Sequence, residues 1–543
     1  MNASSPWSPW RHQAFRAIWT AGLVSNIGNW MQNVGAAWMM TSLTDAIFMV
    51  ALIQTASSVP SFLLALPAGA AADLVDRRRL MLCAQSVMLV VSMALSVATL
   101  TGHMTPWLLL GLTFALGCGN AFSMPAQQAT TSDVVPQDEV PRAVILSGIS
   151  FNSARAVGPL VAGLLIAWAG SGVVFVANVL SFSVVIGLLW RWKNPRRDSA
   201  LPRERLLGGV AAGLRYVRHA PAMHGLILRS TVFVCCSSAL WALLPIVARK
   251  QLGLGAAGYG FMLGSLGIGS VLGAATMPWL RSRLGLTKMV AMATCAFAVA
   301  SFILGYVPVV PLVCLALVLA GVAWIAINAT ISGAVHTSVA HWVRGRALAI
   351  HLLAFQGAMA GGAIFWGAVA TYAGPSTALG LSGLGAVLGL FIMRGRPLVV
   401  SDGTDLVVTP ASAPVGMTGP GDVPGRVVMR ICYRAHAATA DEFMTALHAL
   451  GRYRRRNGAS RWRASVRGIS SPCPADSSDP SDPSDTASVA IIETCAFESW
   501  DEWLRYGERR VLADHRLEAC VQALHIGSAE PAARVRVLAQ RRP

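Results

Sequence analysis

A single arginine stands deep inside an apolar segment of this chain. Arg155 lies about 20 Å along a helix from Arg142 and as far from Trp168, at a rise of about 1.5 Å per residue. A charge at that depth in a membrane costs about 3 kcal/mol or more, and no apolar segment has an acidic residue in its interior to pair with it. Two interpretations stay open. Arg155 either faces a watery cavity and attracts an anionic substrate, or it holds backbone carbonyls of a neighbouring helix.

Amide side chains form a polar stripe on the first apolar segment. Asn26, Asn29 and Asn33 fall within about 60° of one another at 100° per residue. Polar groups in such segments must face protein or water, although hydrogen bonding between helices would also account for them. With two asparagines of later segments and the arginine, the predicted substrate-binding residues are Arg155, Asn29, Asn33, Asn120 and Asn328.

Other side chains have the chemistry of a binding or coupling site. Four tryptophans in apolar segments either stack a planar substrate or pack: Trp30, Trp38, Trp241 and Trp324. Two histidines, His336 and His351, are the groups that could carry protons as the coupling ion, unless they are structural. The ten cysteines include no C-x-x-C pair and form no disulfide framework. We therefore predict no metal and no cofactor.

Two motifs could control helix movement. The first is Gly69-x-x-x-Asp73-x-x-Asp76-Arg77-Arg78-Arg79, in which the carboxylate of Asp73 can pair with an arginine and bond a helix N-terminus. It predicts a conformational latch, with an ordinary basic loop as the alternative; the latch residues are Gly69, Asp73, Arg77 and Arg78. The second lies beside Arg155, where small residues allow tight packing and a proline permits a kink. The residues of this helix-packing motif are Gly158, Pro159 and Gly163.

Long helices must position these residues, and the composition predicts them. The chain has 543 residues, of which 54% are hydrophobic and only 13% charged, whereas a soluble protein carries about 25% charged residues. This excludes an ordinary soluble protein. Twelve segments are long and apolar enough to span a membrane: 15–41, 47–71, 80–101, 106–127, 143–168, 172–190, 222–248, 257–280, 288–307, 309–334, 345–371 and 376–394. The basic loop 191–221 divides them into two halves of six helices, 1–190 and 222–395.

The charges predict the orientation of the chain in the membrane. Residues 1–396 hold 25 Lys and Arg against 8 Asp and Glu, whereas residues 397–543 are nearly balanced. Of the loop charges, 21 basic residues lie on one side, and only Arg249 and Lys250 lie on the other. Basic loops stay in the cytosol, so both termini are predicted to be cytosolic. A nucleic-acid partner is not needed to explain the positive charge.

The last part of the chain reads as a separate domain. Residues 396–425 are rich in Pro, Gly, Ser, Thr and Asp, which is typical of a linker. Residues 426–543 then predict the order β-α-β-β-α-β of a ferredoxin-like α+β domain. The predicted strands are 427–433, 459–466, 489–497 and 533–539, and the predicted helices are 440–456, 499–504 and 511–524. Residues 470–488 are acidic and of low complexity.

The loop at 69–79 resembles the signature of the major facilitator superfamily, with Asp76 where the commoner pattern has glycine. The motif around Arg155 is similar to the helix 5 signature of superfamily antiporters, with alanine at 154 and 162. Residues 121–163 and 341–367 look like the transmembrane secretion effector branch, which includes relatives of enterobactin and macrolide exporters. In this superfamily helices 1, 4, 7 and 10 line the cavity, which fits the helices that hold the asparagines.

Residues 452–462 and 499–504 match the soluble tail that this branch often carries, whose fold is similar to antibiotic-biosynthesis monooxygenases. Those are small dimeric α+β barrels, so the resemblance implies that the soluble domain dimerises. Members often have histidines in the helix after the Ser-Trp pair, where this chain has Trp503 and Gly507. We therefore expect no catalysis, although three polar residues are conceivable catalytic groups: His448, Asn457 and His515.

These observations predict a multi-pass protein of a bacterial inner membrane. By resemblance it is a secondary active transporter that exports a small amphipathic molecule, such as a siderophore or a drug, by alternating access. The alternative is a membrane-anchored oxygenase-like or ligand-sensing domain with little transport. The latch, the packing motif and Arg155 favour transport, because a mere anchor has no use for them.

Overall fold

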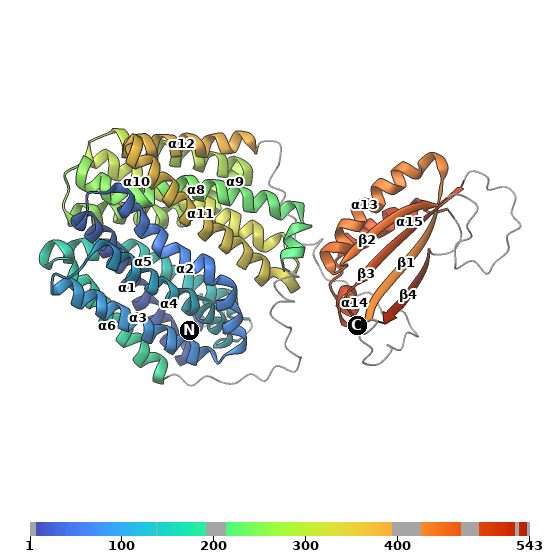
Figure 1. The fold of residues 1–543 in the computed structure, drawn as a ribbon, viewed down its shortest axis with the longest axis horizontal. Coiled ribbons are helices and arrows are strands. Elements are labelled where there is room, and N and C mark those ends of the chain that lie inside the picture. The colour runs from blue at the N-terminus through green and yellow to red at the C-terminus, as the bar shows by residue number, and fades with distance from the viewer. Residues whose placement is uncertain are drawn as a thin grey trace, which may run out of the picture. The chain divides into compact units, whose positions relative to one another are not determined.

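The computed structural model describes residues 7–136, 138–191, 213–393, 425–467, 488–526 and 531–539. The chain divides into two compact units (Figure 1). One unit comprises residues 1–203, 227–332 and 351–398. The other comprises residues 204–226, 333–350 and 399–543. The predicted linker at 396–425 lies almost entirely outside the described residues.

The first half of the chain forms long helices joined by short turns. Asp76 begins α3 by accepting a hydrogen bond from the Arg79 backbone at 2.9 Å, and Thr105 begins α4 in the same way from Leu108. Gly102 and Gly170 adopt positive φ in the turns after α3 and α5, a conformation that glycine reaches without strain. The elements are η1 Ser8–Arg11, α1 Gln13–Leu43, α2 Ile47–Leu74, α3 Arg77–Leu100, α4 Pro106–Asp133, α5 Val140–Ala169 and α6 Ser171–Arg191.

The second half is built in the same way, with two irregularities. A π-helical turn, η2 Val247–Gln251, follows α8 Pro221–Ile246. Helix α9, Ala256–Tyr306, contains Gly285 at φ 69° and ψ 164°, which interrupts the helix between the two segments predicted there. The remaining elements are α10 Val310–Thr337, η3 His341–Val343, α11 Arg344–Ala373 and α12 Pro375–Ile392.

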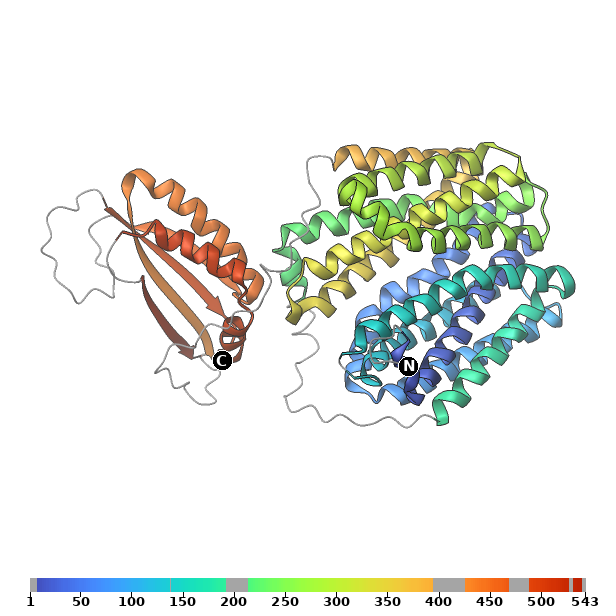
Figure 2. The ribbon, with the colours of Figure 1, turned by 180° about the vertical axis from the view of Figure 1, so that it is seen from behind.

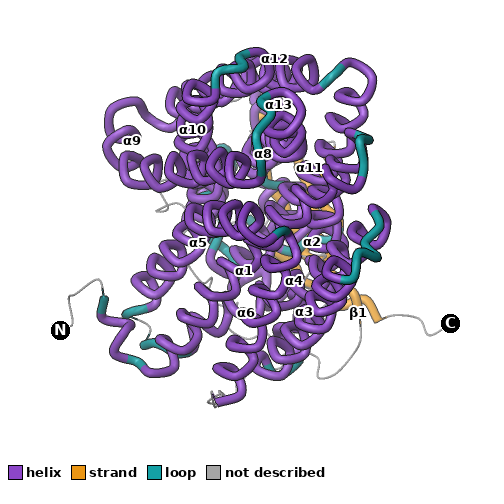
Figure 3. The backbone as a smooth tube through the Cα atoms, turned by 90° about the vertical axis from the view of Figure 1, so that its left-hand side faces the viewer, coloured by secondary structure: helices purple, strands orange, loops and turns teal. Residues whose placement is uncertain are grey.

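Ten of the described helices are long and apolar enough to cross a membrane. Large aromatic side chains near helix ends are strongly exposed, as is typical of residues at the boundary of a bilayer: Trp107, Trp168, Trp190 and Tyr372. Seen from the end, α1–α6 form one group of helices and α8–α12 the other (Figure 3). The protein is therefore a multi-pass membrane protein with two helical halves.

The C-terminal domain is a four-stranded antiparallel sheet with helices on one face (Figure 2). The strand order is β2-β3-β1-β4. Alternate residues of β1 face the helices and join a core that includes Phe443, Leu447 and Phe497. The elements, close to those predicted, are β1 Gly425–His436, η5 Ala437–Thr439, α13 Ala440–Asn457, β2 Arg461–Arg467, β3 Ser488–Phe497, α14 Trp500–Glu508, α15 Leu512–Ala523 and β4 Ala532–Ala539. Cys432 on β1 is disulfide-bonded, whereas the sequence predicts no disulfide framework.

The second unit also contains chain segments from the first 350 residues. Arg215 pairs with Glu502 of α14 at 2.6 Å, and the Arg509 guanidinium lies 4.4 Å from the ring centroid of Trp342. Tyr216 packs edge-on against Trp342, and its hydroxyl accepts a hydrogen bond from the Ala340 backbone. The C-terminal domain thus forms one compact unit with segments that lead into α8 and connect α10 to α11.

Candidate functional site

Arg155 lies in the middle of α5 and is 7% exposed. Three tryptophan rings surround its guanidinium, with the central carbon 5.7 Å from the ring centroid of Trp30, 5.0 Å from that of Trp241 and 5.4 Å from that of Trp324. These rings come from α1, α8 and α10. The two helical halves therefore both contribute to one cationic, aromatic site, which we call the Arg155 site and define by these four residues.

The Arg155 guanidinium has two nitrogen atoms whose hydrogen-bond donors have no described acceptor. Its Nε and Nη2 atoms are buried and have no hydrogen-bond partner among the described residues. Aromatic faces attract the cation but accept no conventional hydrogen bond from it. Buried donors are nearly always satisfied in native proteins, so this site calls for water or an acceptor from outside the chain. No hydrogen bond from Arg155 to a carbonyl is present in the described part of the chain, so the structural alternative has no support here.

Further aromatic rings extend the site into the second half. The Trp241 and Trp324 centroids are 5.5 Å apart, and those of Trp30 and Trp241 are 6.1 Å apart. Phe233 and Phe355 contact Trp324 at 5.9 and 6.1 Å. A cation beside an apolar, polarisable wall suits an amphipathic anion with a flat part.

The predicted asparagines do not join this site through hydrogen bonds. Asn29, Asn120 and Asn328 are partly buried, and Asn33 is exposed. The Asn328 amide donates to the Trp324 carbonyl of its own helix at 2.9 Å. Within the described residues no hydrogen bond links any of the four to Arg155, so their role in binding stays a prediction.

The helix-packing motif lies where α5 meets two other helices. A Cβ added at Gly158 would be 2.7 Å from the Cβ of Trp30, and one added at Gly163 would be 2.8 Å from the Cα of Gly260. The carbonyl oxygen of Pro159 would be 2.7 Å from a Cβ at Gly260. Backbone contacts this close leave no room for a side chain. Helix α5 therefore touches α1 of its own half and α9 of the other half along this stripe, and Trp30 is held directly against Gly158.

The predicted latch at residues 69–79 is only partly visible. Arg78 donates to the Leu189 and Trp190 carbonyls at the end of α6, at 3.0 and 2.5 Å. Among the described residues, nothing lies within 4 Å of a Cβ added at Gly69. The side chain of Asp73 lies outside the described residues. The Arg77 side chain also interacts with another group, so this arginine is not unpaired.

A second set of contacts joins the two halves at the end that carries the 44–46 turn. Arg249, in the π-helical turn, donates to the Thr41 and Ser42 hydroxyls at 3.1 and 2.7 Å. Lys250 pairs with Asp45 at 2.9 Å, and this hydrogen bond holds the pKa of the Asp45 carboxyl below its usual value. The sequence singled out Arg249 and Lys250 only as exceptions in the charge distribution. The structure places them between the halves, in a conformation common at functional positions.

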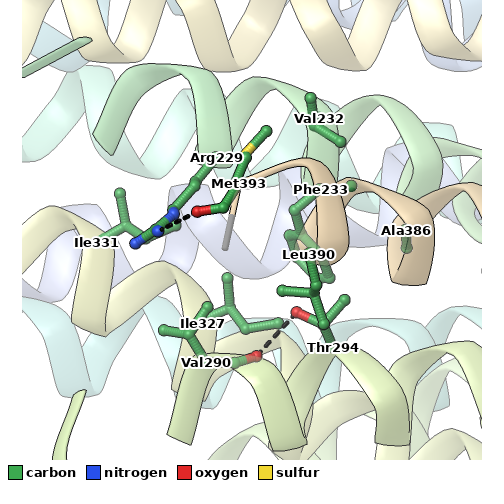
Figure 4. A pocket seen from close by; sticks show the side chains of 11 residues that line it. Arg229, Val232, Phe233, Val290, Thr294, Ile327, Ile331, Ala386, Leu390 and Met393 are labelled. Atoms are coloured by element: carbon green, nitrogen blue, oxygen red, sulfur yellow. Dashed lines mark hydrogen bonds between the residues drawn. The ribbon is translucent and has the colours of Figure 1, made fainter. Parts of the chain in front are cut away.

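A shallow pocket lies between α8, α9, α10 and α12, as Figure 4 shows. Its polar members are Arg229 and Thr294, and Arg229 donates to the Met393 carbonyl at 3.1 Å at the end of α12. Phe233, Ile327 and Leu390 make the rest of its wall apolar. The Arg229 side chain therefore satisfies one of the carbonyl groups left open at the end of α12.

The two histidines differ in their surroundings. His351 in α11 is 7% exposed, and its Nδ1 atom has no hydrogen-bond partner among the described residues. His336, near the end of α10, is exposed. Of these two histidines, only His351 is a buried titratable group with a ring nitrogen that has no described hydrogen-bond partner.

The interior of the C-terminal domain contains a buried polar cluster beside its hydrophobic core. Glu493 accepts hydrogen bonds from Arg454, Trp462 and Tyr433 at 3.2, 2.8 and 3.0 Å. Burial alone would raise the pKa of Glu493, but the Arg454 charge and these hydrogen bonds hold it below its usual value of 4.5. The side chain is thus ionised and fully engaged.

The conceivable catalytic residues of this domain are also engaged. The Asn457 amide donates to Asp514 at 2.6 Å, and a ring nitrogen of His448 contacts the Met444 carbonyl at 2.6 Å. His515 lies 3.2 Å from Arg510. Across the described ranges no group of three His, Cys, Asp or Glu side chains could hold a metal ion.

Comparisons with known proteins agree with the helical architecture. A family model described as "Transmembrane secretion effector" matches residues 4–543. The Staphyloferrin A transporter of Staphylococcus aureus is 22% identical over 278 residues, which are 50% of this chain and 69% of that protein. Enterobactin exporter EntS of Shigella boydii is 25% identical over 313 residues, which are 56% of this chain and 73% of that protein.

Solved structures with little sequence identity share the fold. A crystal structure of the nucleoside transporter NupG, a D323A mutant, has a TM-score of 0.59 at 13% identity and covers 70% of this chain and 99% of that one. A bacterial homologue of the human lysosomal transporter Spinster has a TM-score of 0.55 at 14% identity and covers 72% and 96%. With a family model that spans nearly the whole sequence, the chain belongs to the transmembrane secretion effector family and is a secondary transporter of the major facilitator superfamily.

Proposed function

We propose that this protein exports a small amphipathic anion, of the siderophore class, from the bacterial cytosol across the inner membrane. The observation that carries the proposal is the Arg155 site, where a buried cation with unsatisfied donors lies inside three tryptophan rings. Two relatives are named as a staphyloferrin A transporter and an enterobactin exporter, which supports siderophores as the substrate class. Asn29, Asn33, Asn120 and Asn328 line the same route in this proposal.

Transport proceeds by alternating access of two six-helix halves, 1–190 and 222–395, joined by the loop 191–221. Twelve spans result if α1 and both arms of α9 cross the membrane, because Gly285 divides α9 into two helices. A 51-residue helix would be about 75 Å long, far more than the ~30 Å hydrocarbon layer. Contacts of Arg249 and of Gly163 with the opposite half support a state closed at the end with the 44–46 turn.

The other predicted roles complete this mechanism. Asp73, Arg77 and Arg78 latch one conformation at the cytosolic side, and unchanged export by Asp73→Asn and Arg77→Ala would remove that role. Protons drive export, with His351 as the buried group able to take part. The C-terminal domain is a cytosolic, ferredoxin-like module similar to antibiotic-biosynthesis monooxygenases; the strand order β2-β3-β1-β4 supports this fold. The filled interior around Glu493 supports a role other than catalysis.

Two variants of Arg155 test the binding role. Arg155→Lys keeps the charge and loses the planar fork, so anion export should fall only in part. Arg155→Gln removes the charge, so export of anionic substrates should fall about a hundredfold, as expected for a lost buried charge pair of about 3 kcal/mol. Neutral substrates should be spared. The measurement is uptake into inverted membrane vesicles, normalised to the amount of folded protein.

Equal losses for anionic and neutral substrates in both variants would contradict the proposal and leave Arg155 as a packing residue. Arg229→Gln is the matched control, because this arginine lies in an apolar segment but binds the Met393 carbonyl at a helix end. It should not change the preference between anionic and neutral substrates.

A further inference from the structure

Within the described residues of its own compact unit, the sheet of the C-terminal domain has one face that no helix covers. Helices α13–α15 and the core residues Val427, Ile431 and Phe497 occupy the other face. On the open face the strands carry arginine after arginine, at alternating positions that the pleat brings to one side. Seven of these arginines are exposed, namely Arg434 near the end of β1 and six that define the basic face: Arg426, Arg430, Arg461, Arg463, Arg534 and Arg536.

The strand register shows how closely these charges are placed. Arg430 of β1 lies directly opposite Arg534 of β4 on one side and Thr494 of β3 on the other. Thr494 in turn lies opposite Arg463 of β2, so the three arginines lie in one row across the sheet. Neighbouring strands are about 4.8 Å apart, so like charges directly opposite one another repel and lower stability. None of the paired positions on this face is acidic; Glu498 follows the last residue of β3 at its edge. The positive charge concentrated on this face therefore lowers the stability of the domain.

We infer that this basic face, defined by the six exposed arginines, binds the anionic phospholipid surface of the membrane that the chain spans. Arginine suits this partner because its planar guanidinium bonds phosphate oxygens in pairs. A sheet face with charges spread over three strands fits an extended layer of headgroups rather than a single small ligand. The helical part of the same chain keeps the domain within reach of that plane at all times, so modest affinity suffices.

Other occupants fit the face less well. A second copy docked by a two-fold axis would place this face against itself, which brings arginines against arginines. Single-stranded nucleic acid is usually held by aromatic side chains on an open sheet. The paired positions between these arginines instead hold small or aliphatic residues, among them Val428, Ile492 and Ala496. The remaining rival is the acidic stretch at 470–488 of this chain itself, which carries four aspartates and no basic residue.

The full-length protein, embedded in nanodiscs of neutral phosphatidylcholine, tests the proposal by co-flotation with vesicles. Vesicles that contain phosphatidylglycerol should bind at low salt, and vesicles of phosphatidylcholine alone should not. Each arginine near an anionic surface contributes about fivefold in affinity. The double variant Arg430→Ser, Arg534→Ser should therefore bind about thirtyfold more weakly, and high salt should abolish binding of the unaltered protein.

Removal of an opposed pair of like charges should not lower the melting temperature, so loss of binding would not reflect unfolding. The matched control is Arg452→Ser, Arg516→Ser, which removes two exposed charges from α13 and α15 and should bind as the unaltered protein does. Equal binding by the two double variants, or equal binding to neutral vesicles, would overturn the proposal. Vesicle binding that appears only after Asp476, Asp479, Asp482 and Asp485 are changed to Asn would instead assign the face to the chain's own acidic stretch. Tighter binding to single-stranded RNA than to the anionic vesicles would also overturn the proposal.

Discussion

Arg155 keeps its charge in the membrane because aromatic faces replace part of its hydration. A desolvated cation–π contact contributes about 2 kcal/mol, and three rings around one guanidinium share the same charge, so their contributions do not add in full. The donors on Nε and Nη2 still lack acceptors among the described residues. In the proposed mechanism the rings keep the guanidinium charged while its donors remain available to an anion, which is the balance a transporter needs to take up and release its substrate.

At the same scale, the contacts of Glu493 let us predict how the stability of the soluble domain changes on substitution and at low pH. Glu493→Gln removes one partner of a buried pair and leaves Arg454 with Glu518 as its remaining carboxylate partner. We expect the domain to lose about 2 kcal/mol of stability, because the buried hydrogen bonds that Arg454, Trp462 and Tyr433 donate to Glu493 are no longer charge-assisted. Protection of the β1 amides from hydrogen exchange in the full-length protein measures this. The control Glu442→Gln, the same change at an exposed site of α13, should alter protection by no more than about 0.5 kcal/mol.

The pH dependence follows from the sign of the pKa shift. The pKa of Glu493 in the folded domain lies below the unfolded value, so ionisation favours folding. This contribution is fully present well above about pH 4.5 and is lost as the pH falls through the folded pKa. Glu493→Gln should therefore flatten the acid limb of the stability profile. An unchanged acid limb would show that the pair does not hold the domain together.

Part of the Arg155 site could be predicted from residues alone. Arg155 was identifiable because it is a mid-segment charge with no acidic partner in any apolar segment. Trp30, Trp241 and Trp324 were named only as separate aromatic residues, because nothing in one sequence shows that helices so far apart in the chain meet. Asn328 bonds its own helix, a local choice that spacing cannot reveal.

At the scale of elements, the π-helical turn at 247–251 supplies contacts of unequal strength. Arg249 donates two hydrogen bonds to hydroxyls and lies 5.7 Å from the centroid of Trp38, whereas Lys250 pairs with Asp45, whose side chain is 97% exposed. Charge-assisted hydrogen bonds contribute about 1.5–3 kcal/mol, and exposed ion pairs about 0–1 kcal/mol. Arg249→Ala should therefore shift the balance between closed and open at this end by about tenfold or more, and Lys250→Ala by much less.

Spin-label distances between the 44–46 and 252–255 turns measure this shift, in a background whose native cysteines have been replaced. The short-distance population should shrink in Arg249→Ala and stay close to normal in Lys250→Ala. If the two variants behave alike, simple charge rather than the hydroxyl contacts holds this end together.

Elements were easier to predict than their irregularities. Hydropathy places the helical segments, and alternation of apolar residues places the strands of the soluble domain within a few residues of those observed. The sequence predicts a loop between the segments 257–280 and 288–307, whereas in the structure a single glycine with positive φ, Gly285, interrupts α9 there. The basic face was missed although its signal is in the sequence, since Arg426, Arg430 and Arg434, or Arg534 and Arg536, recur at even spacing along a strand. Even spacing on a strand means one face.

At the scale of the whole molecule, charge and helix count together predict the topology. Arg394 and Arg396 follow α12, and the basic excess of residues 1–396 predicts that both termini lie in the cytosol. Helix α1 is not among the ten candidate spans, and the two arms of α9 on either side of Gly285 count there as a single span. If α1 did not cross, the 44–46 turn and the residues before α1 would lie on the same side. If α9 crossed once, the turn at 307–309 would move to the cytosol.

Reporter fusions at three places distinguish these arrangements. With twelve spans, alkaline phosphatase, which is active only outside the cytosol, should be active when fused in the 44–46 turn and in the 307–309 turn. A fluorescent protein that matures only in the cytosol should be bright at Pro543. Phosphatase inactivity at 307–309 would mean that Gly285 does not return the chain through the membrane, and inactivity at 44–46 would mean that α1 lies outside it. Phosphatase activity at Pro543 would place the basic face and the rest of the soluble domain on the other side of the membrane, which the distribution of arginines in the loops argues against.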